Sequence, residues 1–271
     1  MKTNEGADID VSVVCENENH STFNNTTQSV CPKPNCQYVT QRLGVSVLSS
    51  LEAVSSAFAL DVRSDDLLLH CLDGSSFDPF KMDFDDSRKP VVNDPLVRAI
   101  GKRASNVIDA TAGWCDDAAN LVAHGLNVTA IEQNDVVMTM LAYAVKNAES
   151  SAIKTRLRLV HDNSLDYLNR LEEKVCVVFL DPMYPRKLKS SKPKKRIQIL
   201  QRLVGEPVNE EALLTRALHC ANQRVVVKRP HSAPSLTVKS SIENYDKAGG
   251  NKVGEVSTKL VRFDIYKPFE T

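Results

Sequence analysis

The sequence lacks a net charge, a long apolar run and a signal-like amino terminus, and each absence excludes a class of protein. Its 34 Lys and Arg residues balance its 34 Asp and Glu residues, so attraction to a polyanion must come from local patches. No apolar run approaches the ~20 residues that span a bilayer, so no membrane partner is predicted. Residues 1–10 are polar and lack the apolar core of a secretory signal. We therefore expect a cytoplasmic protein.

Cysteine usage also lacks a pairing pattern. Seven cysteines is an odd number, and Cys115, Cys176 and Cys220 lie in or beside predicted core segments, which favours free thiols in a reducing compartment. Cys31 and Cys36 have no matching Cys or His pair further along the chain, so no metal site is predicted. With 271 residues and 42% hydrophobic content, the chain can bury a large core.

The composition pattern divides the chain into a small domain, residues 1–89, and a larger one, residues 90–271. The first contains a polar loop near residues 17–35 and short alternating segments, which predict an α+β domain with a β-meander. Strands are expected at residues 9–15, 57–62, 67–72 and 77–84, and a helix at 36–47. Residues 49–56 fit a loop or a short helix equally well.

Strands alternate with helices in the larger domain. Strands are predicted at residues 106–110, 127–131, 157–160, 175–180 and 224–227, helices at 116–124, 135–148, 164–171, 197–204 and 210–221, and a hairpin at 254–266. This alternation predicts an α/β fold with a mostly parallel sheet and helices on both faces. Open sheets of this kind bind ligands at the carboxyl ends of their strands.

The segment Asp-Pro-Met-Tyr-Pro at residues 181–185 follows a buried strand directly, because its prolines forbid continuation. The Asp181 carboxylate, the Pro182 carbonyl and the Tyr184 ring combine hydrogen-bond acceptors with a stacking surface. A flat base that carries an exocyclic amine suits that combination, so these three residues are the predicted catalytic residues. The structural alternatives are a turn former at Asp181 and a loop anchor at Tyr184.

Acidic residues surround the glycine that follows the first strand of the larger domain. Gly113 permits close approach to a ligand, and Asp109, Asp116 and Asp117 make the surrounding mouth acidic. A diphosphate prefers unencumbered amides at a helix amino terminus, so a ligand with an amine and a sulfonium fits better. Asp116 serving only as a helix cap is the structural alternative.

Polar residues end the next two strands as well. Glu132, followed by Gln133, lies about twenty residues after the glycine loop, where an acidic side chain can accept from ribose hydroxyls. Asn163 and Ser164 can read an adenine edge. The alternatives are a solvated turn at Glu132 and a helix cap at Asn163. Taken together, these strand ends resemble the cofactor site of class I S-adenosylmethionine-dependent methyltransferases.

The whole motif set resembles the RsmJ family of bacterial methyltransferases, which modify a guanine N2 amine in small-subunit ribosomal RNA. The resemblance covers roughly residues 57–267 and rests on the segments at 109–113, 181–185, 203–205, 224–230 with 233–234, and 262–266. It implies a Rossmann-like fold, S-adenosylmethionine as cofactor, and cofactor contacts at Asp116, Asp117, Glu132, Gln133, Asn163, Ser164 and Asp181.

The chain departs from this family at two places. Gly-Trp-Cys-Asp-Asp at residues 113–117 replaces the usual Gly-Leu-Gly-Arg-Asp, and residues 90–95 replace a Gly-rich segment. The resemblance is therefore weakest at the cofactor loop, residues 113–117.

A basic segment follows the predicted catalytic motif. It contains Arg186, Lys187, Lys189, Lys192, Lys194, Lys195 and Arg196, and the neighbouring strand ends in Lys228 and Arg229. In a neutral protein such a run concentrates positive potential near the site, which favours RNA phosphate as its partner. A mobile solubilising loop is the alternative.

The predicted function is methylation of a guanine N2 amine in 16S ribosomal RNA, either naked or within the 30S subunit. Two alternatives stay open: an amino-methyltransferase that acts on DNA adenine or a protein amide, and a non-catalytic RNA-binding module that has lost cofactor affinity. The sequence leaves the target nucleotide and the oligomeric state undetermined.

Overall fold

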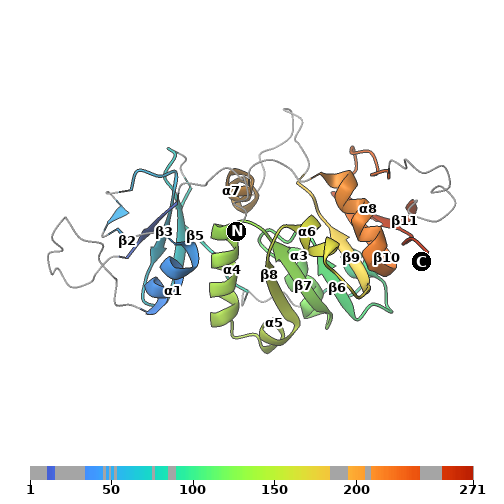
Figure 1. Ribbon diagram of the computed structural model, residues 1–271, viewed down its shortest axis with the longest axis horizontal. Helices are drawn as coiled ribbons and strands as arrows, with labels where there is room; N and C mark the ends of the chain where they lie inside the picture. The colour runs from blue at the N-terminus through green and yellow to red at the C-terminus, as the bar shows by residue number, and fades with distance from the viewer. Residues whose placement is uncertain are drawn as a thin grey trace. The chain divides into compact units, whose positions relative to one another are not determined.

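The structure is a computed structural model (Figure 1). It describes residues 11–15, 34–44, 47–48, 50–51, 54–74, 77–84, 90–183, 195–204, 209–238 and 252–270. These residues group by their contacts into two compact units. The first unit holds the described residues up to Asp83, Asn134–Ala144 and residues 195–204, and the second holds the others. The domain boundary expected after residue 89 stays a prediction. Among the described residues, no helix combines the length and apolar character needed to cross a bilayer.

A five-stranded sheet forms the centre of the first unit, in the order β2-β1-β3-β4-β5. Its strands are β1 (Val11–Val14), β2 (Val47–Leu48), β3 (Phe58–Val62), β4 (Leu67–Cys71) and β5 (Phe80–Lys81), and α1 spans Pro34–Leu43. Strands β3, β4 and β5 are antiparallel neighbours, as a meander requires, whereas β1 is parallel to both β2 and β3. The structure therefore confirms the meander for β3, β4 and β5, whereas the predicted strand β1 joins it in parallel and β2 was not predicted.

Two element boundaries predicted for this unit are also wrong. The helix expected at 36–47 ends at Leu43 because Gly44 takes a positive φ of 67°, the usual end of a helix, and Val47 belongs to β2. Of the segment 77–84, only Phe80–Lys81 forms a strand. The polar loop near 17–35 lies outside the described residues except for its last two, which begin α1.

The second unit contains a seven-stranded sheet in the order β11-β12-β10-β9-β6-β7-β8. Its strands are β6 (Asn106–Asp109), β7 (Asn127–Glu132), β8 (Leu157–His161), β9 (Val175–Leu180), β10 (Ala221–Pro230), β11 (Lys252–Ser257) and β12 (Val261–Tyr266). Strands β6 to β10 pair in parallel, and β12 pairs antiparallel with β10 and β11. The structure thus confirms the mostly parallel sheet and the terminal hairpin.

Helices connect these strands (Figure 1). In the second unit they are α2 (Pro95–Ile100), α3 (Asp116–Ala123), α5 (Ser151–Arg156), α6 (Ser164–Asn169) and α8 (Glu210–Cys220). Two further helices follow β7 and β9 in the chain, α4 (Asp135–Asn147) and α7 (Lys195–Val204), but α7 and most of α4 group with the first unit. The predicted helices all form, within a few residues at their ends. The sequence pattern does not predict α2 or α5.

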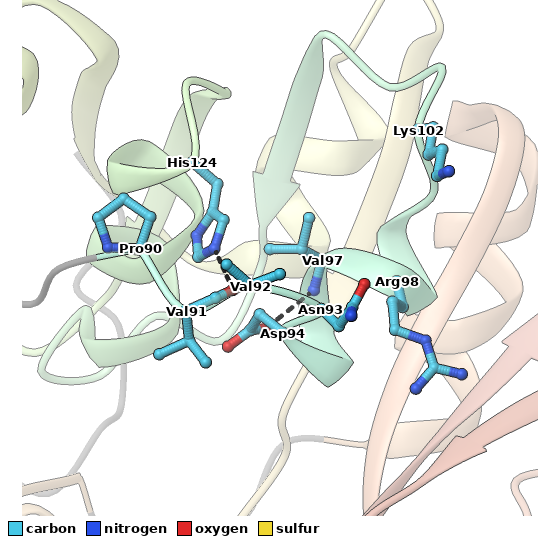
Figure 2. Close-up of a pocket in the computed structure, with 9 residues that line it drawn as sticks. All are labelled: Pro90, Val91, Val92, Asn93, Asp94, Val97, Arg98, Lys102 and His124. Atoms are coloured by element: carbon cyan, nitrogen blue, oxygen red, sulfur yellow. Dashed lines mark hydrogen bonds between the residues drawn. The ribbon is translucent and has the colours of Figure 1, made fainter.

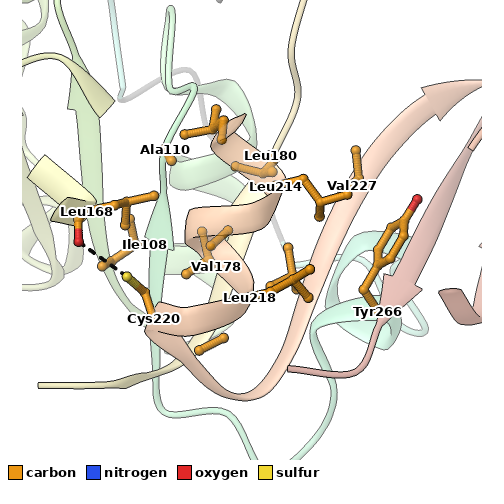
Figure 3. Close-up of a cluster of buried hydrophobic side chains, with 14 of the residues drawn as sticks. Ile108, Ala110, Leu168, Val178, Leu180, Leu214, Leu218, Cys220, Val227 and Tyr266 are labelled. Carbon is orange, nitrogen blue, oxygen red and sulfur yellow. Dashed lines mark hydrogen bonds between the residues drawn. The ribbon is translucent and has the colours of Figure 1, made fainter. Parts of the chain in front are cut away.

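Both faces of the seven-stranded sheet are covered, as a buried parallel sheet requires. Adjacent strand residues point to opposite faces, and both Val177 and Val178 of β9 are fully buried. On one face, Leu214 and Leu218 of α8 pack with Val178 in the hydrophobic core (Figure 3). The Tyr266 ring closes the same cluster, and its hydroxyl donates to the Leu236 carbonyl at 3.0 Å. This rigid core fixes the strands whose ends carry the polar residues.

Candidate active site

The parallel strands bring the predicted site residues to one edge of the seven-stranded sheet. Asp109 ends β6, Glu132 ends β7 and Asp181 follows β9 directly. Strand β6 lies between β7 and β9, where the order of the strands reverses. Such switch points are where open α/β sheets bind ligands.

The loop after β6 is held in a left-handed conformation at two residues. Asp109 is only 2% exposed, and its Oδ1 accepts from the Thr111 N–H at 3.2 Å. Gly113 has a φ of 49° and the fully buried Cys115 a φ of 57°. Cys115 occupies the N-cap position of α3, and Asp116 is the first helical residue. The cap role considered for Asp116 is therefore wrong, and both acids of the pair lie in the first turn of α3.

The polar residues after β7 and β8 contact one another. Glu132 is 6% exposed, so it is not the solvated turn residue of the structural alternative. Gln133 Oε1 accepts from Asn163 Nδ2 at 2.9 Å. Asn163 also caps α6 by accepting from two backbone N–H groups, which confirms the cap expected as its alternative role. The Ser164 hydroxyl donates to the carbonyl of Ala110. The cofactor contacts assigned to these residues remain predictions.

Asp181 is fixed through both its main chain and its side chain. Its N–H donates to Thr111 Oγ1 at 2.6 Å, and its Oδ2 accepts from Lys228 Nζ at 2.8 Å. Pro182, which is buried, follows it. Tyr184 lies outside the described residues, so its stacking role stays a prediction.

Lys228 links two acidic residues, one at the start of α3 and one just after β9. Its Nζ contacts Asp117 Oδ2 at 2.7 Å as well as Asp181 Oδ2. The β9–β10 register pairs Leu180 with the residue before Lys228, which puts the two side chains at the same height along the sheet. Asp109, Asp117, Asp181 and Lys228 are called the carboxyl-edge cluster below. The predicted role of Lys228 was a phosphate contact, and the structure instead directs its ammonium to two carboxylates.

Three carboxyl groups and one ammonium leave this cluster short of positive charge. Burial, together with the negative charge of Asp117, raises the pKa of Asp109 to about 8. Burial also raises the pKa of Asp181 to about 6, although Lys228 opposes the rise. Burial alone would lower the pKa of Lys228, but its two carboxylates outweigh burial and raise it. Within the described part of the chain, no set of His, Cys, Asp and Glu side chains is arranged to hold a metal ion.

Three residues predicted to contact RNA make contacts within the protein, and the RNA contact of Lys195 stays a prediction. Lys195 Nζ pairs with Asp78 at 3.3 Å, and the Arg196 guanidinium lies 5.4 Å from the centre of the Phe80 ring, both within the first unit. Arg229 is 2% exposed and bonds Glu210 at 2.8 Å. These contacts argue against phosphate binding by Arg229 and favour a packing role for Arg196. The remaining basic residues, Arg186, Lys187, Lys189, Lys192 and Lys194, lie outside the described residues.

A second charged cluster lies on the terminal hairpin. Asp264 of β12 is fully buried and bonds Arg262 Nε and Lys252 Nζ, each at 2.8 Å. Lys252, Arg262 and Asp264 are called the hairpin cluster below. Arg262 also donates to the carbonyls of Pro230 and Ala233. The cluster therefore anchors the end of β10, the strand that carries Lys228, and the segment that follows it.

A pocket of about 540 Å³ lies elsewhere in the second unit (Figure 2). It is lined by Pro90, Val91, Val92, Asn93, Asp94, Val97, Arg98, Lys102 and His124. His124 follows the carboxyl end of α3, whereas the acidic pair begins that helix, so the pocket is separate from the carboxyl-edge cluster. His124 Nε2 lies 3.1 Å from the Val91 carbonyl, and Asp94 accepts from Asn120 at 3.2 Å. These contacts fasten residues 90–95, where the chain departs from the RsmJ pattern, to α3.

This chain is similar in sequence to known methyltransferases. A family model described as a putative SAM-dependent methyltransferase matches residues 45–268. The chain is 33% identical to ribosomal RNA small subunit methyltransferase J of Shewanella sp. (strain MR-4), over 89% of this chain and 96% of the relative. It is 37% identical to the protein of that name from Hydrogenovibrio crunogenus, over 64% of this chain and 61% of the relative.

A solved structure shows the same fold. The crystal structure of a SAM-dependent methyltransferase from Neisseria gonorrhoeae superposes with a TM-score of 0.62 at 23% identity, and the match covers 96% of this chain and 98% of that one. The Rossmann-like fold expected from the sequence is thus confirmed, and S-adenosylmethionine is the cofactor that the matching family uses. The chain therefore belongs to the SAM-dependent methyltransferase family that includes ribosomal RNA small subunit methyltransferase J.

Proposed function

We propose that this protein methylates the exocyclic N2 amine of a guanine in small-subunit ribosomal RNA, in the cytoplasm. The names of the relatives supply the RNA class. The carrying observation is the Asp181 carboxylate, which is fixed at the carboxyl end of a central strand beside the loop after β6, called the cofactor loop below. Naked RNA and the 30S subunit are both compatible with such a site.

The strand-end residues fit S-adenosylmethionine. Glu132 offers a buried acceptor for ribose hydroxyls, the acidic Asp117 favours the positive charges of the cofactor, and Gly113 lets a ligand approach the backbone. When bound, this cofactor supplies a methyl group attached to a positively charged sulfur. As the amine nitrogen forms its bond to the methyl carbon, the carbon–sulfur bond breaks, its electron pair stays on sulfur, and the nitrogen loses one proton. The other proposed contacts are Asp109, Asp116, Gln133, Asn163, Ser164 and Asp181.

The acceptor amine needs orientation because its lone pair is delocalised into the guanine ring. Asp181 and the Pro182 carbonyl accept from its N–H groups, which holds the nitrogen in place and stabilises the positive charge that it gains. Tyr184 stacks on the base, a contact worth about 1–3 kcal/mol. A base within folded RNA has to be unstacked to enter such a site.

The basic segment that follows Tyr184 contributes RNA affinity. Its charges, carried by Arg186, Lys187, Lys189, Lys192 and Lys194, concentrate positive potential next to the site in a chain with no net charge. Phosphate contacts of this kind depend on salt but carry little sequence information. The choice of guanine therefore rests on the acceptor site and not on this segment.

The alternatives differ in how well they are supported. DNA adenine and protein amides also carry an amino nitrogen that Asp181 could orient, so they remain arms of the substrate test. Membership in a methyltransferase family counts against the non-catalytic RNA-binding module.

Incubation of small-subunit ribosomal RNA, immature 30S subunits, DNA and total protein with labelled cofactor distinguishes the substrates. Nucleoside mass mapping then has to find N2-methylguanine in the RNA, and a label confined to DNA or protein would refute the proposal.

Asp181→Ala tests the assignment of the acceptor. We expect single-turnover methylation to fall by about 100- to 1,000-fold, because one preorganised hydrogen-bond partner of the reacting nitrogen is lost, while RNA affinity changes little. Asp73→Ala is the matched control, since Asp73 also accepts from a cation at 2.8 Å and is similarly half-buried, but lies in the first unit. A near wild-type rate in Asp181→Ala would remove Asp181 from the catalytic centre.

Tyr184→Phe should keep the activity that Tyr184→Ala loses, because the ring face stacks.

A further inference from the structure

Lys228 is the residue on which three elements of the site converge. Its Nζ lies 2.7 Å from Asp117 in the first turn of α3 and 2.8 Å from Asp181 after β9, while Lys228 itself belongs to β10. The three side chains are between 24% and 38% exposed, so solvent screens the contacts only in part. A single ammonium therefore connects the helix that begins in the cofactor loop with the carboxylate proposed to orient the acceptor.

The geometry leaves half of the Asp181 carboxylate available. Lys228 uses Oδ2, and the Asp181 main chain is held separately by Thr111. Among the residues that the structure describes, no other side chain bonds the Asp181 carboxylate. Oδ1 can therefore accept from an incoming amine while Oδ2 stays fixed, which is the preorganisation that catalysis by oriented groups requires.

The carboxylates that face Lys228 make its charge important for the ionisation of Asp181. Asp117 comes from α3, Asp181 from the end of β9 and Asp109 from β6, and Lys228 is the one cation that the described residues bring to these three. A protonated Asp181 carboxyl group could not act fully as an acceptor. An adjacent ammonium favours the ionised form, whereas burial and like charges favour the protonated form.

We propose that Lys228 is a positioning residue for methyl transfer, which holds the Asp181 carboxylate ionised and oriented through Oδ2 and ties it to α3 through Asp117. This role rests on the proposed function for its substrate, but the state of Asp181 can be measured without any substrate. Lys228 does not contact the reacting atoms itself. Its loss should thus act through Asp181.

The test compares Lys228→Met and Lys228→Arg in the full chain. The pKa of Asp181 is measured by NMR titration of ¹³C-labelled aspartate carboxylates, and its signal is assigned with Asp181→Asn. The pKa is about 6 in the wild-type chain, and we expect it to be higher by about one unit or more in Lys228→Met. Because the deprotonated form is the active one, the acid limb of single-turnover methylation should move to higher pH by a similar amount. For a rise of one unit, the rate should fall about twofold at pH 7 and about tenfold at pH 5, where both proteins are below the pKa of Asp181. Lys228→Arg, which keeps the charge, should retain the wild-type limb.

Lys252→Met is the matched control. Lys252 also bridges two carboxylates, Asp264 at 2.8 Å and Glu255 at 2.5 Å, and is 27% exposed, but it lies in the hairpin cluster. We expect it to leave the pKa of Asp181 and the pH profile unchanged. An unchanged Asp181 pKa in Lys228→Met, or a rate loss with no shift of the acid limb, would overturn the positioning role. If the wild-type protein did not methylate ribosomal RNA, the proposed function would fail, while the NMR titration would still decide the role of Lys228.

Discussion

The carboxyl-edge cluster and the hairpin cluster are both built from acids and a lysine around one buried aspartate, but they differ in charge balance. In the hairpin cluster, burial alone would raise the pKa of Asp264, and hydrogen bonds from Arg262, Lys252 and Ser235 outweigh it and lower the pKa. In the carboxyl-edge cluster, burial prevails and the pKa values of Asp109 and Asp181 are raised. A fully satisfied acid stabilises the fold, whereas an acid short of partners costs stability and is typical of a site that binds or reacts.

The largest expected loss of stability comes from unbalancing the hairpin cluster. Arg262→Met leaves the fully buried Asp264 without its main partner, so we expect the free energy of unfolding to fall by about 3–5 kcal/mol in urea denaturation. Arg170→Met is the control, because Arg170 pairs with Asp162 at the surface with 63% of its side chain exposed and should cost about 0–1 kcal/mol. Equal losses in the two variants would mean that the hairpin cluster is not a stabilising one.

Balancing the carboxyl-edge cluster should have the opposite effect. The pKa of Asp109 is about 8 in the folded chain against an ordinary value of 3.8, so the folded state alone keeps the proton between these pH values. This group therefore contributes a loss of stability as pH rises from about 4 to about 8. Asp109→Asn removes the titration and should gain stability relative to wild type by up to about 1.4 kcal/mol per pH unit in that window. Urea denaturation at pH 5 and pH 8 measures this, and a difference that did not grow with pH would contradict it.

The smallest expected effect separates ligand binding from folding at the same edge. Glu132→Ala should weaken cofactor binding by about 1–3 kcal/mol through the loss of charged hydrogen bonds, as measured by calorimetry with S-adenosylhomocysteine. Glu132→Gln keeps the size and an acceptor oxygen, so it should lose less. If both variants bound the ligand like wild type, Glu132 would have no ribose role, and its burial would be purely structural.

Short-range patterns predicted the second unit well because strand and helix periods repeat over long segments there. The strand at 175–180 was predicted to the residue, since a run rich in valine ends two residues before Pro182. The six-residue helix α2 is too short for a periodic signal, although Asp94 caps it and Pro95 begins it, which is a recognised start pattern. In the first unit, β1 is parallel to β3 across a long intervening segment, and no local pattern encodes such a pairing.

The candidate site was predictable in its acids but not in its cation. Asp109 and Glu132 end apolar strands and Asp181 follows one, so their common edge could be deduced from chain order. The role of Lys228 depends on the register between β9 and β10, which sets it beside Asp181. The basic stretch Lys-Arg at 228–229 resembles a phosphate contact in sequence, and only three-dimensional packing reveals that Arg229 is internal.

The left-handed backbone of Cys115 has a consequence for how the loop after β6 keeps its shape. A non-glycine residue with a φ of 57° costs about 1–2 kcal/mol more than glycine would in the same conformation, and the RsmJ pattern has glycine at this place. Because the Cys115 side chain is fully buried, the loop cannot leave this conformation without withdrawing the thiol from the core. The packing of one side chain therefore offsets the backbone strain, so that this chain keeps by burial a turn that the family pattern forms with glycine.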